Sequence, residues 1–234
     1  MASELHTQER VHTAAWERMR SGLIVSCQAS PGTPLARPDI IAATAETVAL
    51  AGAVAIRAEG VDNVRAVCEA VSIPVIGLIK SHRDDSDVYI TPIVEHVLQM
   101  VEVGASIVAV DATQRSRWNG QTLDEFYEQV RAATDIPLLA DIDCLKNAKH
   151  ADELGFDAIA TTLSGYTDEP SRPLPNIELV SEIAAFTKRP IVAEGGYSNP
   201  AEVRAALKAG AWAVCVGTAI TNPFLMTQRF VAEI

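Results

Sequence analysis

The strongest constraint on the fold is a short segment that occurs four times in the sequence. In each copy a glycine follows a stretch of helical periodicity and opens a short apolar run; the four glycines are Gly52, Gly104, Gly155 and Gly210. Successive copies lie 51 to 55 residues apart. Glycine is favoured just after a helix because it adopts the left-handed conformation without a steric cost. Each copy therefore predicts a point at which a helix ends and a strand begins.

A second series of junctions begins with proline. Pro74, Pro137 and Pro190 each open an apolar run. The residue before a proline disfavours helical geometry, so these positions also predict a change from helix to strand. Together with a first strand over residues 22–27, the two series predict eight strands that alternate with helices, at about 26 residues per unit.

The predicted strands are continuously apolar, which indicates a parallel sheet covered by helices. Eight units without a reversal favour a closed (β/α)8 TIM barrel with a short N-terminal helix. The alternative is an open doubly wound sheet. However, no GxGxxG follows the first strand, which continues as Cys27-Gln28-Ala29-Ser30-Pro31. The length of 234 residues, 48% of them apolar, suits one barrel domain over residues 1–234.

Composition excludes several classes of protein. The four cysteines are dispersed, which argues against zinc and disulfides. The net charge of −11 disfavours nucleic acid and anionic membranes as partners. A polar N-terminus, and the lack of any run of eighteen apolar residues, predict a cytoplasmic protein. The expected helix over about residues 4–20 could close the bottom of the barrel or dock on a partner.

Candidate site residues are the polar residues that end each predicted strand, because TIM barrels build their sites at the carboxyl ends of the strands. In chain order they are Gln28, Arg57 with Glu59, Lys80, Asp111, Asp141, Thr161 with Thr162, Glu194 followed by Gly195 and Gly196, and Gly217 with Thr218.

Lys80, Asp141 and Glu194 form the candidate catalytic group. They end the third, fifth and seventh strands, and residues at equal height on odd-numbered strands converge on one layer of the barrel. The alternative is that Lys80 begins a loop and extends into water. Nearby carboxylates favour the ammonium form, whereas desolvation lowers a lysine pKa, and the sequence leaves the balance between these effects open.

Two glycine-containing turns predict a phosphate site. Gly195 and Gly196 follow the seventh strand, and Gly217 with Thr218 follows the eighth. Backbone N–H groups in such turns approach an anion closely, and the loops after strands seven and eight form the usual phosphate site of these barrels. The alternative is that the glycines only permit tight turns.

The remaining strand-end residues carry weaker signals. Gln28 and Arg57 could contact a substrate, although Arg57 could equally form a local ion pair with Glu59. Asp111 is expected to support a loop. None of the five histidines lies where a catalytic base is expected.

Several motifs together resemble the N-acetylmannosamine-6-phosphate 2-epimerases of sialic acid catabolism. The resemblance covers residues 22–230, and its motifs are Ile79-Lys80 with Asp87-Val88-Tyr89-Ile90-Thr91-Pro92, Val110-Asp111-Ala112-Thr113, Thr162-Leu163-Ser164-Gly165-Tyr166-Thr167 and Ala193-Glu194-Gly195-Gly196. It implies a barrel of the ribulose-phosphate-binding type and a cofactor-independent epimerisation at C2 of an N-acyl hexosamine 6-phosphate, and it is compatible with a homodimer. For a proton shift of this kind no metal is obligatory.

The resemblance also implies roles for individual residues. Lys80 exchanges the C2 proton, and Glu194 is its acid/base partner. Asp141, Gln28 and Arg57 match positions that the family uses around the sugar, and the glycines after strands seven and eight match its phosphate site. Independently of the family, a proton shift next to an aldehyde needs one base, one acid and a donor for the enolate oxygen, which is a set these residues supply.

One departure from the family pattern concerns the phosphate. Family members commonly carry an arginine in an Ile-Thr-Arg-Pro segment, whereas this chain reads Ile220-Thr221-Asn222-Pro223. Arg57 or Arg229 could compensate, or the substrate could lack the phosphate. Two other functions stay open at this point: a Schiff-base aldolase acting on a sugar phosphate through Lys80, and a sugar-phosphate binder without catalytic activity.

Overall fold

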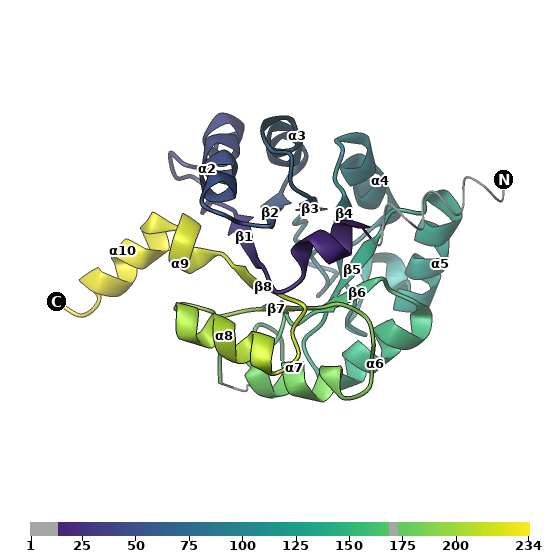
Figure 1. Cartoon of the computed structure of the whole chain (residues 1–234). Helices are drawn as coiled ribbons and strands as arrows, with labels where there is room; N and C mark the ends of the chain where they lie inside the picture. Colours follow the sequence, from purple (N-terminus) through teal and green to yellow (C-terminus); the bar gives the residue numbers. More distant parts are fainter. Residues whose placement is uncertain (1–13, 169–172) are drawn as a thin grey trace.

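A computed structural model describes residues 14–168 and 173–234, and within them the chain forms a closed barrel (Figure 1). Eight parallel strands follow one another around the barrel in sequence order. The TIM-barrel prediction is confirmed, and the alternative interpretation as an open doubly wound sheet is wrong. The strands are β1 (Leu23–Cys27), β2 (Ala55–Glu59), β3 (Val75–Leu78), β4 (Ile107–Asp111), β5 (Leu138–Asp141), β6 (Ala158–Ala160), β7 (Ile191–Glu194) and β8 (Ala213–Val216).

Helices surround the barrel and connect successive strands (Figure 1). They are α2 (Pro38–Leu50), α3 (Val61–Ala70), α4 (Val94–Glu102), the 3-10 helix η1 (Trp118–Gly120), α5 (Leu123–Ala133), α6 (Leu145–Leu154), α7 (Ile177–Ala184), α8 (Pro200–Lys208), α9 (Thr218–Thr221) and α10 (Pro223–Val231). None of the helices in residues 14–168 and 173–234 is long and apolar enough to cross a bilayer.

The glycine and proline junctions lie where the sequence places them. Gly155 follows α6 with φ +99°, and its N–H donates to the carbonyls of Ala151 and Asp152, so the left-handed glycine satisfies the end of the helix. The three prolines each immediately precede a strand, because β3, β5 and β7 begin at Val75, Leu138 and Ile191.

The barrel closes where β1 lies between β2 and β8. Ile24 is in register with Ala55 on one side and with Cys215 on the other. Isoleucine and leucine side chains fill the interior, among them Ile76, Ile107 and Leu139, all fully buried. A second apolar layer lies between the strands and the helices.

The N-terminal end of the barrel is closed by a helix over residues 14–19. Trp16 and Met19 are buried against the interior side chains. The indole of Trp212 donates to the carbonyl of Trp16 at 2.7 Å, and the N–H of Ser21 donates to the carbonyl of Trp212 at 2.6 Å. Of the two alternatives for the N-terminal helix, these residues follow the one in which it closes the barrel. Residues 4–13 of the expected helix fall outside the described ranges.

Candidate active site

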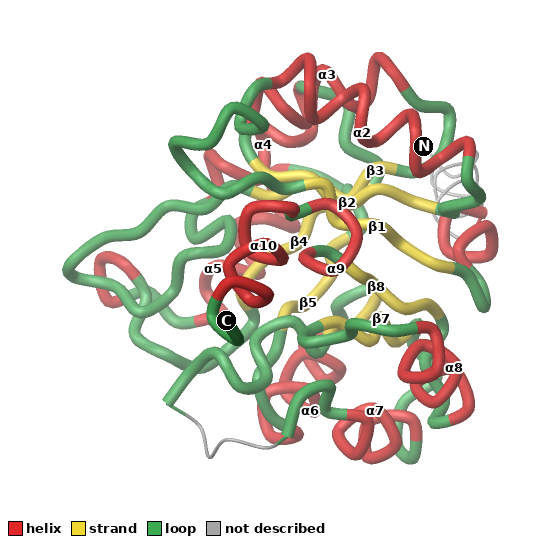
Figure 2. Tube along the Cα trace, turned by 90° about the vertical axis from the view of Figure 1, so that its left-hand side faces the viewer, coloured by secondary structure: helices red, strands yellow, loops and turns green. Residues whose placement is uncertain are grey.

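A cavity of about 390 Å³ opens at the carboxyl ends of the strands. Figure 2 views the molecule from this side, and α9 and α10 lie in front of the strands. Nine of the thirteen candidate residues line the cavity, namely Gln28, Arg57, Lys80, Thr162, Glu194, Gly195, Gly196, Gly217 and Thr218. The other four, Glu59, Asp111, Asp141 and Thr161, do not line it. The fold therefore brings together side chains that are up to 190 positions apart in the sequence.

Lys80 lies two residues beyond β3 and faces the cavity. Its Nζ donates to Oε1 of Gln28 at 2.6 Å, and Nε2 of Gln28 in turn donates to Oγ of Ser26 at 2.9 Å. The pKa of Lys80 is lowered, mainly because its surroundings desolvate the ammonium; the charge of Arg57 adds to this effect, while Glu59, Glu194 and Asp141 oppose it. A larger fraction of neutral amine is therefore available than on an ordinary lysine.

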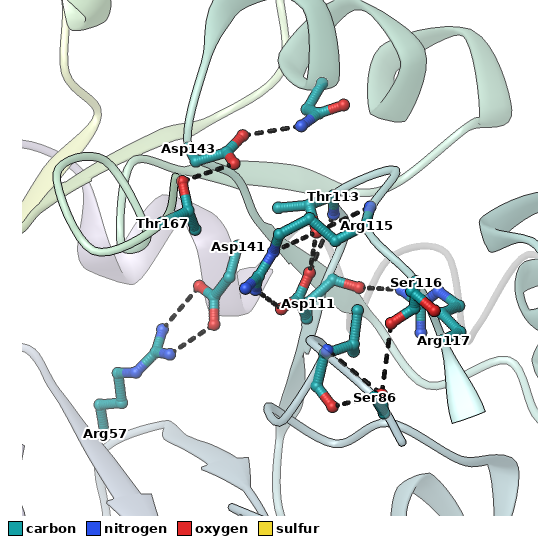
Figure 3. A network of polar contacts seen from close by, with 12 residues as sticks. Arg57, Ser86, Asp111, Thr113, Arg115, Ser116, Arg117, Asp141, Asp143 and Thr167 are labelled. Atoms are coloured by element: carbon teal, nitrogen blue, oxygen red, sulfur yellow. Dashed lines mark hydrogen bonds and ion pairs between the residues drawn. The ribbon is translucent and has the colours of Figure 1, made fainter. Parts of the chain in front are cut away.

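Arg57 lies on β2 with its side chain fully buried inside the barrel mouth. Its guanidinium donates to both oxygens of Asp141, at 3.1 and 2.6 Å (Figure 3). Its Nη1 also lies 3.1 Å from Oε2 of Glu194. These partners replace the local pair with Glu59 that the sequence left open. The two carboxylates raise the pKa of Arg57, so the guanidinium stays charged despite its burial.

Glu194 ends β7, and only 14% of its side chain is exposed. The hydroxyl of Thr162 lies 2.6 Å from Oδ1 of Asp141 and 3.2 Å from Oε2 of Glu194. Burial raises the pKa of Glu194 and the charge of Asp141 adds to this, whereas Arg57, Thr162 and Cys215 act in the opposite direction. Glu194 therefore keeps a proton to higher pH than an ordinary glutamate.

Asp141, the third member of the candidate catalytic group, lies outside the lining of the cavity. Asp141 was grouped with the catalytic residues, but its carboxylate is fully buried and both oxygens are occupied by Arg57 and Thr162. It ends β5 at the predicted height, yet it lies behind Arg57 instead of facing the cavity. The geometry favours a positioning role in which Asp141 orients Arg57 and Thr162.

The predicted phosphate end of the cavity contains the turns after β7 and β8. Gly196 has φ +77°, and a β-carbon there would lie 2.7 Å from Cβ of Leu174, so only glycine fits this turn. Asn199 then caps α8 by accepting from the N–H groups of Ala201 and Glu202. These turns place Gly195, Gly196, Gly217 and Thr218 along the cavity.

Asn222, which departs from the family pattern, has a structural role. Its Oδ1 accepts from the N–H of Leu225 at 3.0 Å and so caps α10, while its Nδ2 donates to Oγ of Ser30 at 3.2 Å. Asn222 therefore fixes the start of α10 next to the loop after β1. Arg229, which lies later on the same helix, also lines the cavity.

Sequence reasoning gave no role to several residues that line the cavity. Tyr89 and Tyr166 belong to motifs that carried the family resemblance, so their motifs were the available signal. Cys215 is buried, and it also touches the cavity beside Glu194. Burial and the charge of Glu194 raise the pKa of the Cys215 thiol, which keeps it neutral.

Hydrogen-bonded loops support the rim (Figure 3). Asp111 is fully buried and accepts from Thr113 at 2.7 Å and from Arg115 at 2.6 Å, as its expected structural role requires. Asp143 accepts from Thr167 at 2.9 Å and from Asn147 at 2.7 Å, which ties the loop after β6 to the start of α6. The loop that carries Thr162 is therefore tied at Thr167 to the segment between β5 and α6.

The fold and the site define a TIM-barrel enzyme whose cavity presents a lysine and a buried glutamate to a small molecule. The family model described as "Putative N-acetylmannosamine-6-phosphate epimerase", NanE, matches residues 41–234. The chain belongs to this family. The protein is therefore an isomerase of the carbohydrate 2-epimerase type.

Individual relatives agree with the family match. Two relatives are both named "Putative N-acetylmannosamine-6-phosphate 2-epimerase". The one from Caldanaerobacter subterraneus subsp. tengcongensis is 46% identical to this chain, and the match covers 93% of both chains. The one from Thermosynechococcus vestitus is 42% identical, and the match covers 93% of this chain and 95% of the relative. The solved N-acetylmannosamine-6-phosphate 2-epimerase from Clostridium perfringens has a TM-score of 0.87 and 36% identity, covering 94% of this chain and 96% of that one.

Proposed function

We propose that the protein interconverts N-acetylmannosamine 6-phosphate and N-acetylglucosamine 6-phosphate by moving the proton on C2. The names of the relatives supply the substrate, and the arrangement of Lys80 and Glu194 around one cavity supports the chemistry. By the family resemblance, we also propose that the reaction serves sialic acid catabolism.

The proposed reaction acts on the open-chain sugar, in which C2 lies next to the aldehyde. One group removes the C2 proton, the resulting enolate is held in the cavity, and a second group returns a proton to the opposite face. A base and an acid suffice for these steps, so the residues present match a cofactor-independent reaction. Lys80 and Glu194 are assigned these two roles, and which one acts first depends on the direction of the reaction.

The surrounding residues would prepare the two proton-transfer groups. Arg57 and Thr162 both contact Oε2 of Glu194, which fixes the carboxyl group in one orientation. Gln28 accepts from Lys80 and so aims its amine across the cavity. Gln28 and Thr162 are further proposed to contact the sugar, and the N–H groups around Gly195, Gly196, Gly217 and Thr218 to contact the phosphate.

One observation carries the proposal: Lys80 from β3 and Glu194 from β7 line the same cavity, and opposing shifts bring their pKa values closer together. Enzymes tune acid–base pairs toward the working pH in this way. The arrangement needs no covalent intermediate, which separates it from the Schiff-base aldolase.

Proton NMR of N-acetylmannosamine 6-phosphate in deuterated water tests the proposal. The wild-type protein should remove the C2 proton signal and produce the gluco epimer. Lys80→Ala and Glu194→Gln should each slow this exchange by about 10²–10⁴-fold, the usual contribution of a positioned acid or base. Lys208→Ala, on the outer helix α8, is the matched control and should exchange at the wild-type rate.

Two outcomes would reject the proposal. A wild-type protein that binds the sugar phosphate and leaves the C2 proton in place would be a binder and not an epimerase. Borohydride trapping of the substrate on Lys80 would favour the aldolase instead.

A further inference from the structure

One face of helix α10 forms a side of the cavity. Asn222, Leu225 and Arg229 all line the cavity. Asn222 caps the helix, Leu225 comes three residues later and Arg229 seven, a spacing that places side chains on one face over two turns. The face that meets the cavity thus carries an amide, a leucine and a guanidinium.

The charges of the cavity distinguish Arg229 from the other cations. Three cationic side chains line the cavity, namely Arg57, Lys80 and Arg229. Arg57 is neutralised by Asp141 and Glu194, and Lys80 donates to Gln28 at the reacting centre. Within the part of the chain that the structure describes, the side-chain contact of Arg229 is with Sδ of Met226 at 3.9 Å, and no carboxylate lies within 4.0 Å. Arg229 therefore brings an uncompensated positive charge.

A phosphorylated substrate needs such a charge here for two reasons. The whole chain carries a net charge of −11, which opposes the approach of a dianion. The capping residue Asn222 uses its Oδ1 on the Leu225 N–H and its Nδ2 on Ser30, and an amide carries no charge in any case. The glycine turns after β7 and β8 offer N–H groups, but they offer no cation.

We propose that Arg229 binds the phosphate group of the substrate from α10, with Asn222 holding the helix in place. A guanidinium suits phosphate because its planar fork of donors matches two phosphate oxygens. The identity of the sugar rests on the proposed function, whereas the binding of a phosphoryl group by Arg229 does not require that the protein epimerises anything.

Two measurements on Arg229→Ala test the proposal. The KM for N-acetylmannosamine 6-phosphate should rise roughly 10- to 100-fold with kcat little changed, as expected for the loss of one charge-assisted contact that is equal in ground and transition states. The affinity for inorganic phosphate, followed by phosphorus NMR titration, should fall by a similar factor. Arg229→Lys should retain part of the affinity, since it keeps the charge and loses the fork.

Arg65→Ala is the matched control. Arg65 is an exposed arginine on α3 that pairs with Asp62, so this change removes the same charge far from the cavity and should leave both measurements unchanged. An equal effect of both arginine changes would show that net charge alone acts, and would overturn the proposal. Unchanged phosphate affinity in Arg229→Ala would also overturn it.

The two proposals fail separately. If the wild-type protein epimerises the sugar phosphate and Arg229→Ala has a wild-type KM, the role of Arg229 is wrong and the function stands. If the wild-type protein shows no C2 exchange while phosphate binding still depends on Arg229, the function is wrong and the phosphate site stands.

Discussion

Arg57 is a buried residue that links two carboxylates at the centre of the site. Its guanidinium bridges Asp141 and Glu194, and the hydroxyl of Thr162 contacts both of those carboxylates. A buried ion pair stabilises a fold only when both partners are present, because the loss of one leaves an uncompensated charge. Asp141 and Arg57 therefore depend on each other for their stability inside the barrel.

Asp141→Asn should lower the free energy of unfolding by about 3 kcal/mol, the cost of breaking a buried charged pair. Asparagine keeps the size of the side chain but provides no charge opposite Arg57. Urea denaturation measures the change. Asp39→Asn is the control, because Asp39 pairs with Arg37 on the surface and 60% of its side chain is exposed. The urea midpoint of this variant should stay near the wild-type value. Equal midpoints for the two variants would contradict this account of Asp141.

The pH profile of kcat/KM should be a narrow bell. The reaction needs one of the pair Lys80 and Glu194 protonated and the other deprotonated. The raised pKa of Glu194 moves the acidic limb above 4.5, and the lowered pKa of Lys80 moves the basic limb below 10.5. Activity should therefore rise with pH through the glutamate pKa and fall through the lysine pKa. Limbs at or beyond those ordinary values would show that the cavity does not tune the two groups.

At the scale of the element, the junctions were predictable because their causes are local. A glycine after a helix and a proline before a strand act through the geometry of one or two residues, so Gly155 and Pro137 mark their junctions without knowledge of the rest of the fold. The same local reasoning placed Lys80 and Glu194 at the ends of their strands. A closed barrel then brings those ends to one cavity.

The surroundings of Asp141 and Arg229 depend on geometry that the sequence does not contain. Asp141 ends its strand as predicted, but its burial depends on Arg57 reaching across the barrel from β2. Arg229 has a helical spacing from Asn222 that the sequence shows, yet the direction of α10 relative to the cavity is a property of the assembled fold. The position of a residue at a strand end therefore does not predict which partner a long side chain reaches, or on which side of the cavity the last helix lies.

The turn after β7 gives an element-scale prediction. Gly196→Ala should destabilise the fold more than Gly32→Ala, although the two glycines have φ of +77° and +76°. Both changes incur the left-handed cost of about 1–2 kcal/mol. Only alanine at 196 also meets Leu174, while the surroundings of Gly32 are open, and overpacking adds about 1–3 kcal/mol. Chemical denaturation of both variants checks the difference, and equal losses would show that Leu174 moves aside freely.

Across the whole molecule, the two ends of the barrel contribute to different properties of the protein. The N-terminal end is filled by Trp16 and Met19 and gives stability, whereas the carboxyl end carries the cavity and the charged groups. This division allows the loops at the open end to be shaped for a ligand without loss of the apolar interior. The cytoplasmic location and the homodimer suggested by the sequence stay predictions.

The pairing of β1 with β8 has a consequence for the newly made chain. β1 leaves the ribosome before the other seven strands, but one of its edges gains its partner only when residues 213–216 have emerged. Protein synthesis adds roughly 5–20 residues per second, so that edge stays unpaired for on the order of ten seconds or longer. An unpaired strand edge can join a neighbouring polypeptide, so synthesis of this barrel passes through a stage at which shielding by a chaperone should raise the yield.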